Sequence, residues 1–276
     1  MNGASYITTR QILWAQRHGL SVKMRNKGGN VEDVRKNLFE ALSPQAADDF
    51  GQGAGNELRG KMCALHSSSA LAVNVFHYLQ RTGNLNLAAR ALGIRQGAYD
   101  ALRFEAQFPV RGVKLKFPNA VPHLDAILTG SSKPQAVAIE GKFREPYGRK
   151  HRQLRQTYLD LANDIWEGWD ALRNAAEELI AENWQPEYLD AAQLITHLLG
   201  LRSKFGPTGF RLIILWYDVP FDEGAAHRKE IEEFRDLATE DQIRVEQITY
   251  QDVIADLATE RVNHPDYVDW LAERYL

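Results

Sequence analysis

Two apolar runs near the middle of the chain predict a β-hairpin. Residues 124–129 and 135–143 are rich in β-branched and small side chains. The five residues between them are turn formers, including one glycine, two serines and one proline. We therefore expect two antiparallel strands joined by a short turn.

The register of this hairpin brings charged residues together. If the strands fold symmetrically about the Ser132–Lys133 bond, Asp125 lies opposite Glu140, with Cβ atoms roughly 5 Å apart. Because side chains alternate along a strand, Glu140 and Lys142 face the same side. We expect two carboxylates and one ammonium to converge on one face, an arrangement that a divalent cation would complete.

Other periodic segments predict helices alternating with strands. The predicted helices cover residues 5–24, 31–42, 66–80, 153–183, 191–205, 227–237 and 263–276, with another from Asp252, and the predicted strands cover 104–110, 209–219 and 243–248. This order is typical of an α/β domain with a mixed sheet flanked by helices. Residues 1–50 are predicted to form an N-terminal helical extension, or lobe, packed on a core domain of residues 51–276.

The string Glu140-Gly141-Lys142, on the strand after Asp125, resembles the signature of the PD-(D/E)xK nuclease superfamily, which has the restriction-endonuclease-like fold. It is the only acidic-x-Lys triplet in the sequence, and it falls inside an apolar strand. The longer strings PHLDAIL and EGKFREPY are similar to a poorly characterised bacterial branch of that superfamily. The sequence departs from the superfamily pattern at the proline, because Pro122 stands three positions before Asp125 rather than next to it. The resemblance covers about residues 51–256.

The resemblance implies a metal-dependent hydrolysis of DNA. It assigns Mg²⁺ or Mn²⁺ to Asp125, Glu140 and the carbonyl of Gly141, and it gives Lys142 the role of steering water and stabilising negative charge. It also suggests Glu57, on a helix ahead of the sheet, as an additional acidic residue, although a glutamate that stabilises the helix N-terminus explains Glu57 equally well.

Further candidates surround this site. Glu105 joins the acidic cluster if its strand pairs beside the hairpin. Glu145 binds a second ion or pairs with an arginine. The resemblance also implies that the helix of residues 191–205 packs on the sheet and that a glutamine there points to the site, so Gln193 and His197, one helical turn apart, are candidates to support it. A histidine there is more often a core residue.

A basic segment follows the hairpin. With the exception of Glu145, its charged residues are cations, and tyrosines are interleaved among them. Such a segment beside an acidic site is suited to binding the phosphates of a polyanion. The predicted nucleic-acid-binding residues are Arg144, Arg149, Lys150, Arg152 and Arg155. The alternative is a solvated helix face.

The composition adds limits. Hydrophobic residues make up 44% and charged residues 25%, which is typical of a globular protein, and the net charge is −3. Cys63 is the only cysteine, which excludes an intramolecular disulfide and fits the reducing cytoplasm where we expect the protein. No apolar run reaches the roughly 18 residues of a membrane span, and the N-terminus lacks a signal-peptide hydrophobic region.

Three other functions fit parts of the pattern. The first is a catalytically silent nucleic-acid-binding protein of the same fold. The second is a helix-turn-helix regulator, because residues 85–103 resemble that motif, with Arg95 and Gln96 reading DNA. The third is a purely structural protein.

Under the nuclease hypothesis, RNA is an alternative substrate to DNA. Cleavage of both strands of a duplex would favour a homodimer.

Overall fold

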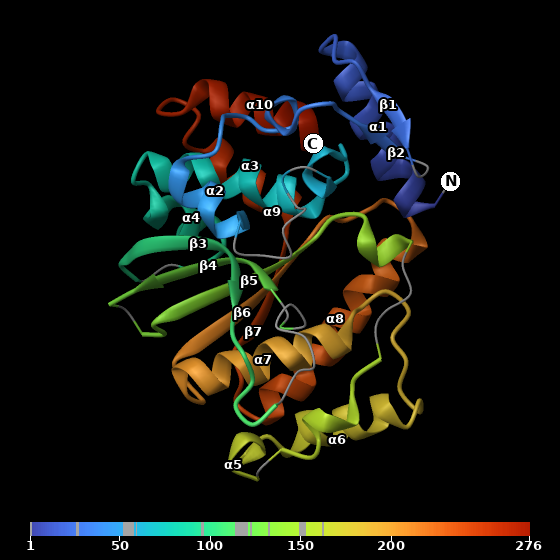
Figure 1. Cartoon of the computed structure of the whole chain (residues 1–276), viewed down its shortest axis with the longest axis vertical. Helices are drawn as coiled ribbons and strands as arrows, with labels where there is room; N and C mark the ends of the chain where they lie inside the picture. The colour runs from blue at the N-terminus through green and yellow to red at the C-terminus, as the bar shows by residue number, and fades with distance from the viewer. Residues whose placement is uncertain are drawn as a thin grey trace.

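The structure is a computed structural model that describes residues 2–25, 28–51, 58, 60–94, 97–113, 121, 123–131, 133–148, 153–161 and 163–276. Groups of helices and groups of strands follow one another along this chain (Figure 1). The α-helices are α1 (Gly3–Arg17), α2 (Pro44–Gly51), α3 (Ser68–Arg81), α4 (Leu85–Ala91), α5 (Asn163–Trp166), α6 (Asp170–Ile180), α7 (Ala191–Phe205), α8 (Asp222–Glu240), α9 (Tyr250–Ala258) and α10 (Pro265–Tyr275). The strands are β1 (Lys23–Arg25), β2 (Gly28–Asn30), β3 (Tyr99–Gln107), β4 (His123–Gly130), β5 (Ala136–Lys142), β6 (Phe210–Trp216) and β7 (Val245–Thr249).

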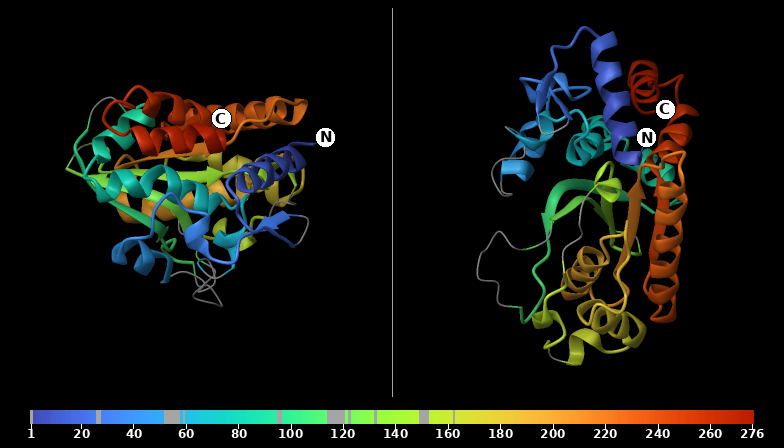
Figure 2. Two further views of the ribbon diagram at one scale, coloured as in Figure 1. Left: turned by 90° about the horizontal axis from the view of Figure 1, so that it is seen from above. Right: turned by 90° about the vertical axis from the view of Figure 1, so that its right-hand side faces the viewer.

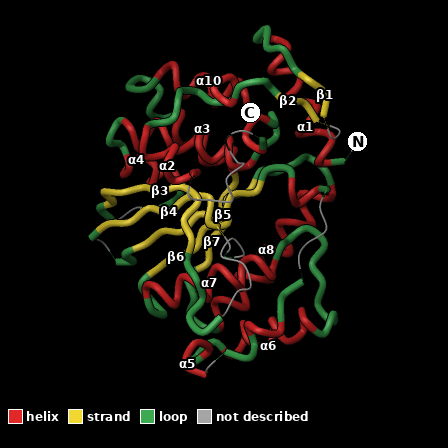
Figure 3. The backbone as a smooth tube through the Cα atoms, viewed as in Figure 1, coloured by secondary structure: helices red, strands yellow, loops and turns green. Residues whose placement is uncertain are grey.

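Within the described residues, five strands form one mixed sheet in the order β3-β4-β5-β6-β7 (Figure 3). Strand β4 pairs antiparallel with both β3 and β5, and β6 pairs parallel with both β5 and β7. Strands β1 and β2 form a separate antiparallel pair. The predicted mixed α/β sheet is confirmed.

The hairpin register is also confirmed over its ladder. The ladder between β4 and β5 runs from Thr129 opposite Ala136 to Ala126 opposite Ile139. These pairs are symmetric about the bond between residues 132 and 133, as expected for a hairpin that folds symmetrically about that bond. Residues on both faces of β5 are buried, so the turn between the two strands, and not the apolar pattern alone, sets this register.

Helices cover both faces of the sheet. Figures 1 and 2 show α1 to α4, α9 and α10 on one side, and α5 to α8 on the other. The alternation along β5 divides the core accordingly: Val137 and Ile139 pack with the first group, and Ala136 and Ala138 with the second. We call these the α3 face and the α7 face.

Helix α7 matches the predicted helix of residues 191–205. Asp190 caps its start, since Asp190 Oδ1 accepts a hydrogen bond from the Gln193 amide at 3.0 Å. Gly206, at a φ of +74°, ends it. The helix that packs on the α7 face of the sheet therefore has a defined start and a defined end.

The N-terminal helices differ from the prediction. The first ends at Arg17 rather than near residue 24, because Gly19 adopts a φ of +66° and closes the helix. The expected helix over 31–42 is wrong, since this segment holds only the 3₁₀ turn η1 (Val34–Lys36) among regular elements. Its backbone bonds elsewhere: the Val31 amide donates to the Cys63 carbonyl at 2.9 Å. Tertiary partners have replaced the helical ones.

The helix-turn-helix alternative is wrong as well. Its first helix exists as α4, but the expected recognition helix is replaced by strand β3, which starts at Tyr99. Strand β3 pairs with β4 along its length. Arg95 and Gln96, the proposed DNA-reading residues, lie outside the described residues.

The N-terminal residues share the core of the sheet. Ile7, Leu38 and Phe50 belong to the same buried cluster as Val137 and Ile139.

Among the described residues, no helix combines the length and the apolar character that crossing a membrane requires.

Candidate active site

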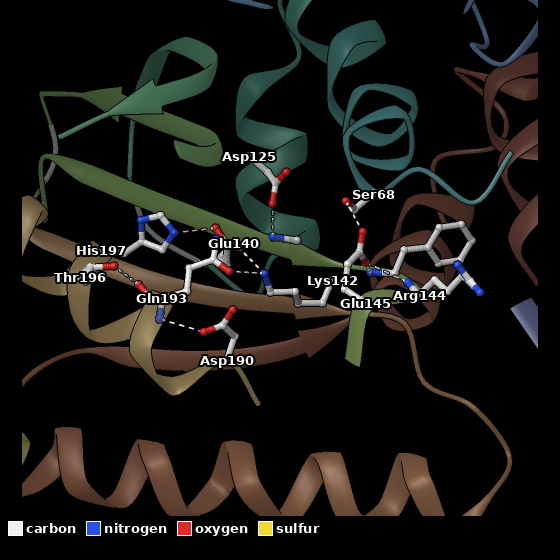
Figure 4. Close-up of polar contacts among 12 residues, drawn as sticks. Ser68, Asp125, Glu140, Lys142, Arg144, Glu145, Asp190, Gln193, Thr196 and His197 are labelled. Atoms are coloured by element: carbon white, nitrogen blue, oxygen red, sulfur yellow. Dashed lines mark hydrogen bonds and ion pairs between the residues drawn. The ribbon is translucent and has the colours of Figure 1, made fainter. Parts of the chain in front are cut away.

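The centre of the site is the carboxyl end of β5. Glu140 and Lys142 project to the α7 face, as the alternation predicts, and Lys142 Nζ lies 2.6 Å from Glu140 Oε1 (Figure 4). The Glu140 side chain is only 2% exposed and that of Lys142 14%. A charge pair this deeply enclosed is costly unless further polar groups surround it.

Helix α7 supplies those groups. Gln193 Oε1 accepts a hydrogen bond from Lys142 Nζ at 2.7 Å, and His197 Nε2 lies 3.0 Å from Glu140 Oε2. Gln193 and His197 are one turn apart, so both face β5. The structure thus brings both helix candidates into contact with the Glu140–Lys142 pair, from a helix whose start is capped by Asp190.

Asp125 reaches β5 from a different side. Its Oδ2 accepts a hydrogen bond from the Gly141 amide at 2.7 Å, and Figure 4 shows this carboxylate on the other side of the strand from Glu140 and Lys142. The expectation that all three charges converge on one face is therefore wrong. The reason is a change of face in β4: Leu124 packs on the α7 face, whereas Ala126 packs on the α3 face.

Strand β3 is distorted at the same place. Phe104 and Ala106 pair with β4 on either side of Asp125, so Glu105 lies next to Asp125 across the strands. Glu105 has a φ of +48°, which is strained for a residue with a side chain, and its Oε2 lies 2.9 Å from His123 Nδ1. Backbone strain of this kind concentrates at functional sites.

The pKa shifts distinguish the Glu140–Lys142 pair, in which both groups stay charged, from Asp125, whose carboxyl resists ionisation. Burial opposes the charge on Glu140, but Lys142 and His197 outweigh it and lower the pKa of Glu140 to about 2. Burial also opposes the charge on Lys142, yet Glu140 and Asp125 raise its pKa. For Asp125, burial, followed by the charges of Glu140 and Glu105, raises the pKa well above the ordinary value. An added cation would favour the ionised form of Asp125.

The oxygen atoms at this end of β5 are suitable ligands for a hard cation such as Mg²⁺. The N–H and C=O of one strand residue point to the same edge, so the carbonyl of Gly141 faces the side from which Asp125 approaches. The next carbonyl, of Lys142, points the opposite way and accepts from the Tyr217 amide at 2.9 Å. Carboxylate and carbonyl oxygens suit Mg²⁺ or Mn²⁺. Among the described residues, no three His, Cys, Asp or Glu side chains form a complete metal cluster.

Glu145 sits in a tight turn after β5. Its Oε1 accepts from Ser68 Oγ at 2.9 Å, and its Oε2 accepts from the amides of Phe143 and Arg144, each at 3.0 Å. This carboxylate therefore holds the turn to the start of α3. It also contributes to raising the pKa of Lys142.

The remaining candidates divide into described and undescribed residues. Arg144 lies beside His66 and Glu145, and Arg155 is exposed. Glu57, Arg149, Lys150 and Arg152 lie outside the described residues.

His66 is a half-buried titratable group beside this turn. Its ring covers Gly28, where a Cβ atom would come within 2.2 Å of His66 Cε1. Burial, reinforced by the positive charge of Arg144, lowers the pKa of His66 to about 4 from its ordinary 6.5.

This shift predicts a pH dependence of stability. The unfolded chain takes up a proton on His66 below pH 6.5, while the folded chain resists it until about pH 4, so stability falls as the pH drops through this window. We expect wild type to lose about 2 kcal/mol more than His66→Gln between pH 7 and pH 5. Urea unfolding of both proteins at the two pH values measures the difference, and equal losses would contradict it.

Two residues near Asp125 were not anticipated from the sequence. His123 precedes Asp125 by two positions on the same strand, and that spacing was an available signal. Tyr250 begins α9, and its hydroxyl reaches Gly141 from the α3 face. No local pattern connects Tyr250 with β5, because the two are brought together only by the parallel pairing of β5, β6 and β7.

Comparison with known proteins gives one finding. A family model described as "Restriction Endonuclease associating with ARP" matches residues 11–276. No curated protein and no solved structure matches the chain. The match covers every strand of the sheet and the whole of the site described above.

Proposed function

Because this chain belongs to that restriction-endonuclease family, we propose that it is a metal-dependent endonuclease that hydrolyses phosphodiester bonds of DNA. One observation carries the proposal. The Glu140–Lys142 ion pair, which Gln193 and His197 contact, lies on either side of Gly141 in the sequence, and Asp125 binds the amide of that glycine. A structural ion pair alone would not explain Asp125, a second carboxylate whose ionisation its neighbours oppose.

Lys142 has the most direct role in this proposal. An ammonium has three donors, of which one is directed to Glu140 and one to Gln193. The third would reach the substrate, where it orients a water molecule and stabilises the negative charge that develops at the phosphate. A fixed donor of this kind needs no reorganisation during the reaction.

Asp125, Glu140 and the Gly141 carbonyl are the residues that would hold Mg²⁺ or Mn²⁺. The ion supplies Lewis-acid charge next to the phosphate and makes water a better nucleophile. Glu57 is the proposed additional acid. Glu105 would act through Asp125, beside which it lies.

DNA would bind across the end of β5 and the basic segment after it. Arg144 and Arg155, together with Arg149, Lys150 and Arg152, would contact phosphates, so binding should weaken steeply with salt. The family description also names an association with ARP, and we propose the same association for this chain on that description alone.

The proposal is tested with plasmid DNA, the purified protein and either Mg²⁺, Mn²⁺ or EDTA. We expect nicking or linearisation that requires metal and that falls at least about 100-fold in Asp125→Asn, since the variant keeps the shape but loses an anionic ligand. Asp266→Asn, an exposed residue in the first turn of α10, is the matched control and should cleave normally. Metal-dependent cleavage at the wild-type rate by Asp125→Asn would refute the assignment.

A further inference from the structure

One buried hydroxyl beside the site has no role in the proposal above. Tyr250 is fully buried at the start of α9, directly after β7. Among the described residues, no group makes a hydrogen bond to its Oη. A buried hydroxyl normally finds a partner, and leaving it without one is costly, so a phenylalanine would fill this place with less penalty.

The hydroxyl lies close to Asp125 over Gly141. A Cβ atom built on Gly141 would lie 2.5 Å from Tyr250 Oη and 3.3 Å from Asp125 Oδ2, so both groups occupy the space above the Gly141 backbone. Tyr250 and Asp125 therefore face each other across Gly141.

The same geometry explains the glycine. Gly141 lies within the regular strand β5, so its backbone conformation does not call for glycine. The constraint is space, because any side chain at position 141 would collide with the Tyr250 hydroxyl. The small residue between Glu140 and Lys142 thus leaves room for a group that reaches the site from the α3 face.

We propose that Tyr250 is a positioning residue whose hydroxyl donates a hydrogen bond to the carboxylate of Asp125 when that carboxylate binds the divalent cation. The Gly141 amide already donates to Oδ2 at 2.7 Å. A second donor from the α3 face fixes the rotation of the carboxylate and directs its other oxygen to the cation. Donors behind a metal ligand commonly change metal affinity by about 10- to 100-fold. The inference rests on the proposed metal-dependent function.

The test compares Mn²⁺ binding to wild type and Tyr250→Phe, measured directly by titration calorimetry in the absence of DNA. We expect the Kd for Mn²⁺ to rise about 10-fold in Tyr250→Phe. We expect kcat for plasmid cleavage to fall while KM for DNA is unchanged. The melting temperature should stay the same or rise, because the variant removes a buried hydroxyl that has no partner.

Tyr267→Phe is the matched control. Tyr267 is also buried on the α3 face, but its hydroxyl donates to the Val75 carbonyl. This variant should lower the melting temperature and leave the Kd for Mn²⁺ unchanged. A purely structural role for Tyr250 would give the same result in Tyr250→Phe, and that result would overturn the inference.

The wild-type titration separates the two proposals. If wild type binds Mn²⁺ and Tyr250→Phe binds it equally well, the inference fails and the proposed function stands. If wild type binds no Mn²⁺, the metal-dependent function fails and the inference fails with it.

Discussion

Replacing Lys142 with methionine is expected to lower the rate of DNA cleavage about 100- to 1,000-fold, the effect of removing one fixed donor from a site of developing charge. Methionine has a similar length but cannot donate to Glu140, to Gln193 or to a phosphate. The loss should appear in kcat, because the contacts that bind DNA over the basic segment stay in place. Plasmid nicking under single-turnover conditions measures it.

The same variant should destabilise the fold. Lys142 and His197 lower the pKa of Glu140 to about 2 from 4.5, so the ionised carboxylate is stabilised by the folded state above pH 4.5, and this contribution is lost as the pH falls toward 2. Without Lys142 a buried carboxylate keeps only His197. We expect a loss of about 3 kcal/mol at pH 7, measured by urea unfolding, and a smaller loss near pH 2.

Two further variants separate activity from folding. Glu140→Gln combined with Lys142→Met removes the buried carboxylate that would otherwise lack its lysine partner, so stability should largely recover while cleavage does not. Lys229→Met changes an exposed lysine of α8 that lies 3.5 Å from Glu233, and it should leave both properties unchanged. Full cleavage by a folded Lys142→Met protein would refute the role given to this lysine.

Arg274→Met is expected to produce a large loss of stability elsewhere in the molecule. Arg274, on α10, is 1% exposed, and its guanidinium lies 4.2 Å from the centre of the Trp14 ring. It donates to Gln11 Oε1 at 3.0 Å, to the Asn37 carbonyl at 2.8 Å and to the Leu65 carbonyl at 3.3 Å. Arg274 therefore joins α1, the segment after β2 and the C-terminal helix.

Its removal leaves several buried acceptors without a donor. Each costs about 1–3 kcal/mol, partly offset because the buried charge itself is costly, as the lowered pKa of Arg274 indicates. We expect a net loss of about 3 kcal/mol in urea unfolding, and Arg274→Lys should not restore it, since lysine lacks the planar fork.

Arg261→Met provides the control for this prediction. Arg261 precedes α10, is 64% exposed and pairs with Asp269. Its loss should cost under about 1 kcal/mol, as for other exposed ion pairs. A similar small effect of Arg274→Met would mean that Arg274 does not link these segments as described.

The hairpin and helix α7 could be predicted because their signals are local. Residues 136–139 of β5 form an unbroken apolar run, apolar side chains recur at helical intervals in α7, and turn or cap residues end each element. The candidates Glu140, Lys142, Gln193 and His197 lie on these regular elements. The shared face of Glu140 and Lys142 follows from strand alternation, and the shared face of Gln193 and His197 follows from helical spacing.

The predictions failed where backbone groups found distant partners. Residues 31–42 have helical spacing, but the carbonyl of Asn37 bonds to Arg274 and the amide of Phe39 bonds to Asn74 Oδ1 at 2.8 Å. A buried backbone group needs one partner, and partners supplied by α3 and α10 remove the need for a helix. Periodicity alone cannot distinguish these outcomes.

The mixed α/β fold, the hairpin register and the shared face of Glu140 and Lys142 can be predicted from the amino-acid order, since turn residues and side-chain alternation are local properties of the chain. The direction in which Asp125 points depends on the tertiary fold. The strain at Glu105 and the change of face in β4 turn that carboxylate toward Gly141, and a five-stranded sheet brings Tyr250 to the same place. Such contacts depend on the twist and order of strands distant in the chain, which no local spacing encodes.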